Sequence, residues 1–171
     1  MALPPDDSLP TVSDATARKR HLRAVALAWT FGIAVAAIYV LVRDVPAAGW
    51  RINDVTTGET KEYPELQSRI YDSTPENTTL FAAAAASRLT RWKVIRTDRV
   101  THTVICEVKT PLNLFTDDVT IRIEPFGPSK DASRVQIHSR SRVGRSDLGQ
   151  NAQHIRELQS AMDEKLPRLN P

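Results

Sequence analysis

The stretch that decides the fold runs from Ser133 to Asn151 and reads SRVQIHSRSRVGRSDLGQN. Successive side chains of a strand point to opposite faces of a sheet, so strict alternation predicts a half-buried strand. Here one face carries Val135, Ile137, Ser139 and Ser141, and the other carries Arg134, Gln136, His138, Arg140 and Arg142. The stretch therefore predicts a strand with one apolar face, then a turn at Gly144 and the start of a helix.

Three earlier segments alternate in the same way, at residues 92–97, 102–109 and 119–124. Turn-forming stretches separate them, so we expect four strands paired in sequence as an antiparallel meander with one apolar face. Cys106 alternates with valines on its strand, which predicts a small buried side chain. A single cysteine cannot form an internal disulfide, so packing alone must hold the fold together.

Helical patterns precede and follow these strands. Thr74 and Pro75 are typical of a helix start, and the alanine run at residues 82–86 favours the helix that follows. After Asp147 an apolar stripe recurs at three- and four-residue spacing: Leu148, Ala152, Ile155, Leu158, Met162 and Leu166. We therefore predict an α+β domain over residues 73–167, a four-stranded antiparallel meander flanked by an N-terminal and a C-terminal helix on its apolar face. Residues 44–72 are expected to form a linker and an extended segment.

The N-terminal part of the chain has a different composition. Residues 1–17 contain prolines and small polar residues without apolar periodicity, which predicts a disordered tail. Residues 18–43 hold a basic cluster followed by an uncharged run, AVALAWTFGIAVAAIYVLV, from Ala24 to Val42. A bilayer core requires about 20 apolar residues in a helix, so this region predicts a single transmembrane helix.

Two alternatives to a retained anchor remain open for this run. A cleaved signal peptide has an apolar region of only about 7–15 residues, which is shorter than the run seen here. A buried helix of a soluble domain does not explain why basic residues gather at one end. If the helix is retained, the positive-inside rule places the N-terminus in the cytoplasm and the globular domain on the extracytoplasmic side, periplasmic or equivalent.

Composition and motifs argue against several classes of function. A formal net charge of +3 is too small for a typical nucleic-acid-binding protein. The four histidines and one cysteine lack the spacing of a metal site, and we expect no cofactor. Neither a Gly-x-Ser-x-Gly motif nor a glycine-rich phosphate loop is present. The pair Asp117–Asp118 is more typical of a loop that precedes a strand than of a catalytic acid and base.

The strand-to-helix stretch is the candidate binding site. Arginine suits bidentate contact with phosphate or carboxylate, and backbone amides at a helix start can hold an anion. The candidate ligand-binding residues are His138, Arg140, Ser141, Arg142, Arg145, Ser146, Asp147 and Asn151.

A structural explanation of the same residues stays open beside the binding site. Asp147 can cap its own helix, with Gln150 completing a capping box. The arginines can pair across the sheet with acidic residues, since surface ion pairs are common: Glu107, Asp117, Asp118 and Glu124.

Three pieces of the sequence resemble a bacterial and plastid family known as domain of unknown function 1499. They are NDVTT at residues 53–57, DDVTIRIEP at residues 117–125 and SRSRVGRSDLGQNAQHIR at residues 139–156. The resemblance spans roughly residues 50–166 and leaves out the N-terminal helix. No activity or ligand is established for that family, so the resemblance implies a shared fold and a shared site but no reaction.

Three hypotheses for function follow. The first is a membrane-anchored, non-catalytic domain that binds an anionic small molecule or lipid headgroup at the arginine–serine stretch. The second is a structural or assembly factor that binds a membrane-protein partner through the polar sheet face. The third and weakest is a hydrolase-like enzyme that uses Asp118, His138 and Arg142.

Overall fold

The computed structural model describes residues 12–43, 49, 51–110 and 113–169. Its contacts divide the chain into two compact units, residues 1–44 and 45–171. Each unit is described separately.

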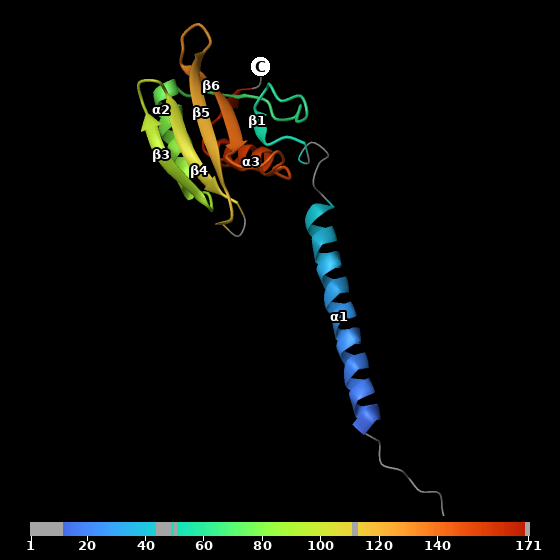
Figure 1. Cartoon of the computed structure of the whole chain (residues 1–171). Coiled ribbons are helices and arrows are strands. Elements are labelled where there is room, and N and C mark those ends of the chain that lie inside the picture. The colour runs from blue at the N-terminus through green and yellow to red at the C-terminus, as the bar shows by residue number, and fades with distance from the viewer. Residues whose placement is uncertain (1–11, 44–48, 50, 111–112, 170–171) are drawn as a thin grey trace, which may run out of the picture. The chain divides into compact units, whose positions relative to one another are not determined.

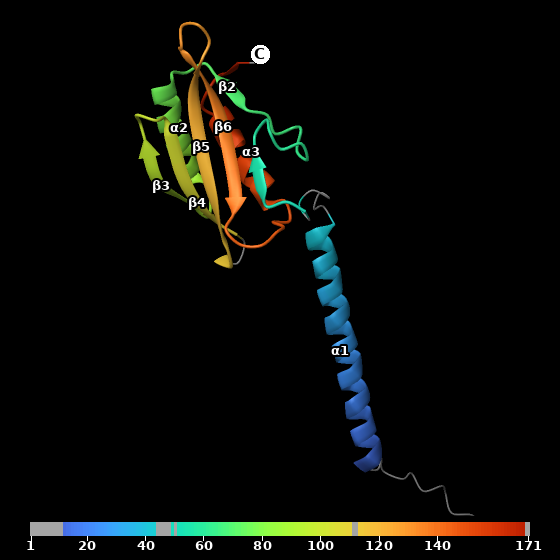
Figure 2. The same cartoon turned by 45° about the horizontal axis from the view of Figure 1, so that its top comes forward.

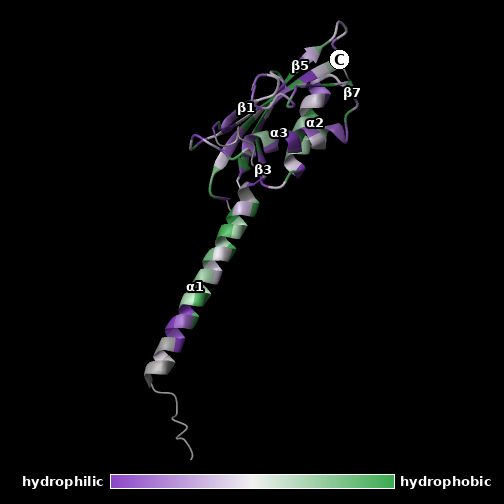
Figure 3. Cartoon of the chain, turned by 90° about the vertical axis from the view of Figure 1, so that its right-hand side faces the viewer, coloured by the Kyte–Doolittle hydropathy of each residue, from purple (hydrophilic) through white to green (hydrophobic). Residues whose placement is uncertain are grey.

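The described part of the first unit, residues 12–43, contains one helix, α1, which spans Val12–Val42. Within it, Arg18–Val40 has a mean hydropathy of 1.7 and is long and apolar enough to cross a membrane, although a signal sequence would pass the same test. Figure 3 shows the hydrophilic residues of α1 toward its N-terminal end and the hydrophobic ones beyond them. The helix begins earlier than expected: residues 12–17, predicted as disordered tail, are helical, and the rest of that tail lies outside the described residues.

The second unit contains two further helices and seven strands within the described residues. In chain order they are β1 (Asp54–Thr56), β2 (Arg69–Tyr71), α2 (Pro75–Arg88), β3 (Trp92–Asp98), β4 (Thr103–Lys109), β5 (Thr116–Phe126), β6 (Ala132–Ser141), α3 (Gln150–Asp163) and β7 (Arg168–Leu169). Thr74 caps α2 by accepting a hydrogen bond from the Asn77 amide at 3.4 Å, as its sequence predicts. This unit is α+β, as expected.

The sheet is antiparallel and has the order β3-β4-β5-β6-β2-β7, with β1 also paired to β6 (Figures 1 and 2). The predicted meander is therefore its central part, and the prediction of only four strands is wrong. Strands β1 and β2 pair with opposite halves of β6, at residues 138–140 and 133–135. Each has only three residues, too few to show alternation, so their conformation comes from pairing with β6.

The core lies between the sheet and two helices on one of its faces (Figures 1 and 3). Ile155 and Leu158 of α3 belong to the same buried cluster as Ile121 and Ile137 of the sheet. Cys106 is fully buried, as predicted, and burial raises the pKa of its thiol to about 12. The inner face of β6 thus holds the core, while its outer face is left for charged residues.

Candidate functional site

The outer sheet face holds the predicted arginines in ion pairs. Arg142 donates from Nε to both carboxylate oxygens of Asp118, at 3.1 and 3.0 Å, and from Nη2 to Glu107 at 2.5 Å. Both acids lie on neighbouring strands in the register that the sheet requires, since Glu107 is opposite Asp118. These contacts favour the structural explanation of Arg142, because its guanidinium group already donates to the carboxylates of Asp118 and Glu107.

The next basic residues along β6 share a different acid. The His138 ring lies 2.7 Å from Asp54 Oδ1, and Arg140 Nε lies 3.8 Å from Asp54 Oδ2. Asp54 comes from β1, which places its carboxylate beside Arg140 in the sheet register. Arg145 is exposed in the turn after β6 and does not line the pocket described below.

The turn between β6 and α3 has an unusual backbone. Gly144, Leu148 and Gly149 all have positive φ angles, of 92°, 55° and 83°. Glycine adopts this region at little cost, whereas leucine does so only where its surroundings impose it. The Ser146 hydroxyl donates to the Gly49 carbonyl at 2.6 Å, and the Leu148 amide donates to the same oxygen at 2.8 Å. Gly49 therefore helps to fix this strained turn.

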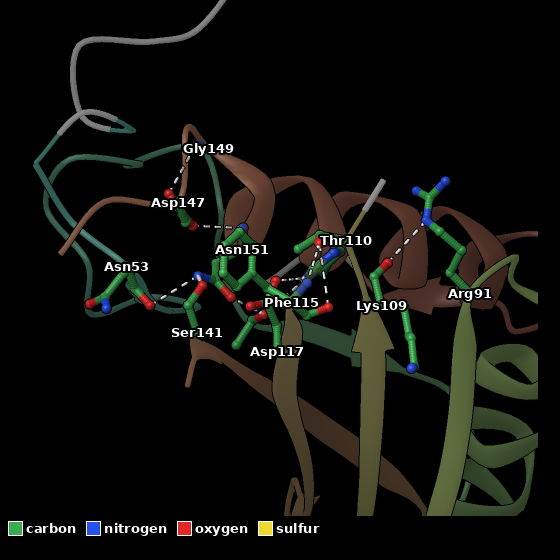
Figure 4. A network of polar contacts seen from close by, with 12 residues as sticks. Asn53, Arg91, Lys109, Thr110, Phe115, Asp117, Ser141, Asp147, Gly149 and Asn151 are labelled. Carbon is green, nitrogen blue, oxygen red and sulfur yellow. Dashed lines mark hydrogen bonds and ion pairs between the residues drawn. The ribbon is translucent and has the colours of Figure 1, made fainter. Parts of the chain in front are cut away.

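The Asp147 carboxylate occupies the place at the start of α3 where an external anion was expected to bind. Asp147 accepts hydrogen bonds from the amides of Gly149, at 2.9 Å, and Asn151, at 2.7 Å, as Figure 4 shows. A carboxylate at a helix N-terminus satisfies free amides and interacts favourably with the helix dipole. The predicted capping box is nevertheless wrong, because the N-cap of α3 is Gly149 and the Asp147 side chain bonds the amides of Gly149 and Asn151 rather than that of Gln150.

Asn151 joins three segments beneath that turn. Its amide group donates to the Asn53 carbonyl at 2.9 Å and to the Ser141 hydroxyl at 3.0 Å. Its oxygen accepts a hydrogen bond from Ser139 at 2.6 Å. Asn151 is fully buried, and its side-chain amide nitrogen and oxygen both have hydrogen-bond partners. It therefore acts as a structural link between the end of β6, the chain before β1 and α3 (Figure 4).

A pocket of about 350 Å³ opens beside this link, a volume at the small end of ligand sites. We call it the Asp117 pocket. Its rim is apolar and strongly exposed: Leu114, Phe115, Val143 and Leu148 have 66, 54, 65 and 42% of their surface accessible. The other lining residues are Thr110, Asp117, Ser141, Gly144, Ser146, Asp147 and Gln150. Three of the eight predicted site residues line it: Ser141, Ser146 and Asp147.

Asp117 is a buried carboxyl group without hydrogen-bond partners. Only 1% of its surface is exposed, and neither of its oxygens has a partner in the described part of the chain. Burial raises its pKa above the ordinary value, and the nearby carboxylates of Asp147 and Asp118 raise it further. The Ser141 hydroxyl is close enough to lower this pKa in part, although the geometry between the two groups falls outside that of a hydrogen bond.

His154 of α3 lies next to Asp117. Its Nδ1 atom is 3.8 Å from Asp117 Oδ2, and its Nε2 atom is buried without a partner. Burial lowers the pKa of His154 to about 4, with Arg91 adding to the shift, so the ring is neutral near pH 7. The pair is therefore not an ion pair at neutral pH.

This cluster lacks the arrangement of a nucleophilic triad. In such a triad the nucleophile and the carboxylate approach different nitrogens of the imidazole. Here Ser139, at 3.4 Å, and Asp117 both approach Nδ1, and Ser139 is fully buried and donates to Asn151. The chain described here also contains no group of three potential metal-binding side chains. The arrangement of Ser139, His154 and Asp117 therefore differs from that of a Ser–His–Asp triad.

A second pocket, of about 330 Å³, lies between α2 and α3 and includes Leu89 and Met162 in its lining. None of its described lining residues has a buried polar atom without a partner. The Asp117 pocket differs in this respect, because Asp117 supplies two such atoms.

The comparison with protein families gives one match, to a protein of unknown function (DUF1499), over residues 8–162. The chain belongs to the DUF1499 family. No curated protein and no solved structure matches the chain. The predicted family is thereby confirmed, although the match begins at residue 8 and includes the N-terminal helix, which the resemblance over residues 50–166 left out.

The three pieces that carry the resemblance to DUF1499 meet at one end of the domain. Asn53, from the first piece, donates to the Gly144 carbonyl at 2.5 Å and accepts from Asn151, both in the third. Asp117 begins the second piece and lies beside Ser141 in the register of β5 and β6. The second and third pieces contribute lining residues to the Asp117 pocket, and Asn53 of the first piece contacts Asn151 next to it (Figure 4).

Sequence reasoning missed Asp117, His154 and the apolar rim as candidate site residues. Asp117 had a signal: it falls on the same alternating face of β5 as Val119 and Ile121, where an acid is out of place. His154 had one too, because it lies four residues before Leu158 on the buried side of α3. The rim residues come from two loops, and only folding brings them together.

Proposed function

We propose that this protein is a membrane-anchored, non-catalytic domain that binds a small, mainly apolar ligand in the Asp117 pocket. The ligand places its polar end on Asp117 and its apolar body against the exposed rim. Its N-terminal helix is retained, with the basic end in the cytoplasm and the domain on the extracytoplasmic side.

The single observation that carries this proposal is the pair of unpartnered Asp117 oxygens at an apolar pocket. A buried polar group without a hydrogen bond costs free energy, so proteins rarely retain one without a use for it. A ligand that supplies the missing hydrogen bond recovers that cost and also buries the exposed rim.

The backbone around the pocket supports a binding role as well. Leu148 holds a positive φ angle and contributes an exposed side chain to the rim. Backbone strain of this kind occurs most often at ligand sites, because it lowers stability and persists only where the surrounding structure imposes it. The uncharged run from Ala24 to Val42 within α1 supports a location where apolar ligands are abundant, since a bilayer concentrates them.

Methyl NMR of the full chain in phosphatidylcholine nanodiscs tests this proposal, with octanol as the probe. Leu114, Val143 and Leu148 supply labelled methyl groups inside the pocket, and Leu89 supplies one in the pocket between α2 and α3. We expect saturable shifts of the first three methyl signals and little change at Leu89. Empty nanodiscs measure how much octanol the bilayer absorbs.

Saturable shifts confined to Leu89, or no saturable shift at any of the four residues, would contradict the proposed function. A variant strengthens the distinction: Val143→Asp places a charge on the rim and should weaken octanol binding, because the apolar chain then meets a solvated carboxylate. Val143 is largely exposed, so this change should leave folding intact.

A further inference from the structure

We infer that the Asp117 pocket selects a ligand with an amino group on an apolar body, such as a lipophilic primary amine, and rejects the matching carboxylate. This inference rests on the proposed function and names the chemical class of its ligand. It reverses the sign of charge expected from the arginines of the sequence, because those arginines lie outside the pocket lining.

The charged groups in the pocket lining favour a cationic ligand. Its described residues include two carboxyl groups, Asp117 and Asp147, and no basic side chain. Asp147 shares its oxygens with two backbone amides of α3, which offsets part of its charge. Asp117 has no such contact, so it is the free acceptor of the pocket.

The free hydrogen-bond acceptors of the pocket lining favour a ligand that donates hydrogen bonds. An ammonium group has three donors and no acceptor, so it matches a carboxylate with two free oxygens. Two hydroxyl groups of the lining already donate to backbone carbonyls, Thr110 to Phe115 and Ser146 to Gly49, and the Ser141 oxygen accepts from Asn151. A carboxylate ligand would instead meet Asp117 and Asp147, and like charges in a desolvated site repel.

The groups that face Asp117 decide how binding depends on pH. They are Asp147 in the turn before α3, Ser141 on β6 and His154 on α3, while the charge of Asp118 acts from the outer face of the same strand. Burial and the two acids favour the protonated carboxyl group in the free protein, and His154 is neutral above about pH 4. At pH values below the raised pKa of Asp117, binding of an ammonium ion therefore releases one proton from Asp117 to solvent and leaves an ammonium–carboxylate pair in the pocket.

The direction in which amine affinity changes with pH follows from the proton that Asp117 releases on binding. A primary amine keeps its charge well above neutral pH, since an alkylamine titrates near the lysine value of about 10.4. Its affinity should rise with pH through the raised pKa of Asp117 and then level off, because deprotonated Asp117 no longer has a proton to lose. A neutral alcohol should show little change over the same range.

The test compares octylamine, octanol and octanoate on the full chain in nanodiscs, using the same methyl signals of Leu114, Val143 and Leu148. At mildly alkaline pH we expect octylamine to bind at least about tenfold more tightly than octanol, the gain typical of a charge-assisted hydrogen bond. Octanoate should bind most weakly. Asp117→Asn should remove the preference for octylamine while octanol still binds.

Asp118→Asn is the matched control. It removes the same charge one residue away, but from the outer sheet face, where Asp118 pairs with Arg142. This variant should keep the octylamine preference. If octanol binds but octylamine has no advantage, or if octanoate binds most tightly, the amine inference is overturned and the proposed function stands. If none of the three probes binds, the proposed function fails as well.

Discussion

At the scale of single residues, the two unsatisfied groups Asp117 and His154 set how the domain responds to pH. Both are 1% exposed, and their side chains face each other across the junction of β5 and α3. Burial disfavours the charged form of each, which raises the pKa of the acid and lowers that of the base. Their effects on stability therefore have opposite signs.

Asp117 should destabilise the fold as pH rises above the ordinary value of 3.8 toward its raised pKa. Below that ordinary value the carboxyl is protonated in both states and costs nothing, whereas at higher pH only unfolding lets it ionise freely. Asp117→Asn should therefore be more stable than the native protein at neutral pH, by about 1.4 kcal/mol for each unit by which burial raises the pKa of Asp117, because the amide does not ionise. Urea denaturation in detergent micelles measures this, and a difference independent of pH would contradict the assignment.

His154 should destabilise the fold as pH falls from 6.5 toward about 4. Its contribution is complete above the unfolded pKa and is lost on acidification, because the unfolded state accepts the proton first. The loss should approach about 3 kcal/mol, from 1.36 kcal/mol per pKa unit. His154→Gln should remove this dependence in the same urea experiment. An unchanged slope in that variant would show that His154 does not titrate as the structure indicates.

At the scale of elements, the turn from β6 into α3 depends on a glycine from a distant part of the chain. The Gly49 carbonyl accepts from both Ser146 and Leu148. A Cβ atom added to Gly49 would collide with the Gly149 amide nitrogen and lie 2.7 Å from the Leu148 carbonyl carbon. Both neighbours are backbone, so they cannot rotate away.

Gly49→Ala should therefore displace this turn and destabilise the domain by about 1–3 kcal/mol, as overpacking usually does. It should also weaken octanol binding, because the pocket rim moves with Leu148. Thermal unfolding and the methyl titration measure the two effects. Gly32→Ala is the control, since nothing lies within 4 Å of its added atom. Native stability and native binding in Gly49→Ala would refute the role given to this contact.

The sequence predicts the helices and strands that are long enough to show a regular apolar pattern. It does not predict the short strands, which show none. Period-two alternation placed Ser139 and Ser141 inside and Arg140 outside on β6, as the structure has them. The short strands β1 and β2 have no pattern of their own, because pairing with β6 imposes their conformation. The same alternation places Arg140 on the outer face, as predicted, so it gives no indication of the pocket beside Asp117 and Ser141.

At the scale of the whole molecule, the proposed function requires α1 to remain attached to the domain. The uncharged run and the basic end predict a retained helix with the domain translocated. A tag placed after Pro171 should be reached by protease only when the outer side of the membrane is exposed. The full-length protein should also stay with membranes after a carbonate wash. Release of a shortened, soluble chain would favour a cleaved signal peptide.

The central claim is that a ligand occupies the Asp117 pocket, and intermolecular nuclear Overhauser effects test it most directly. The full chain in nanodiscs is saturated with octylamine, and contacts are recorded from the probe protons to the protein methyl groups. The account predicts contacts to Leu114, Val143 and Leu148, with none to Leu89, and weaker contacts in Asp117→Asn at a matched probe concentration below saturation. Contacts to Leu89 alone, or to lipid alone, would contradict it.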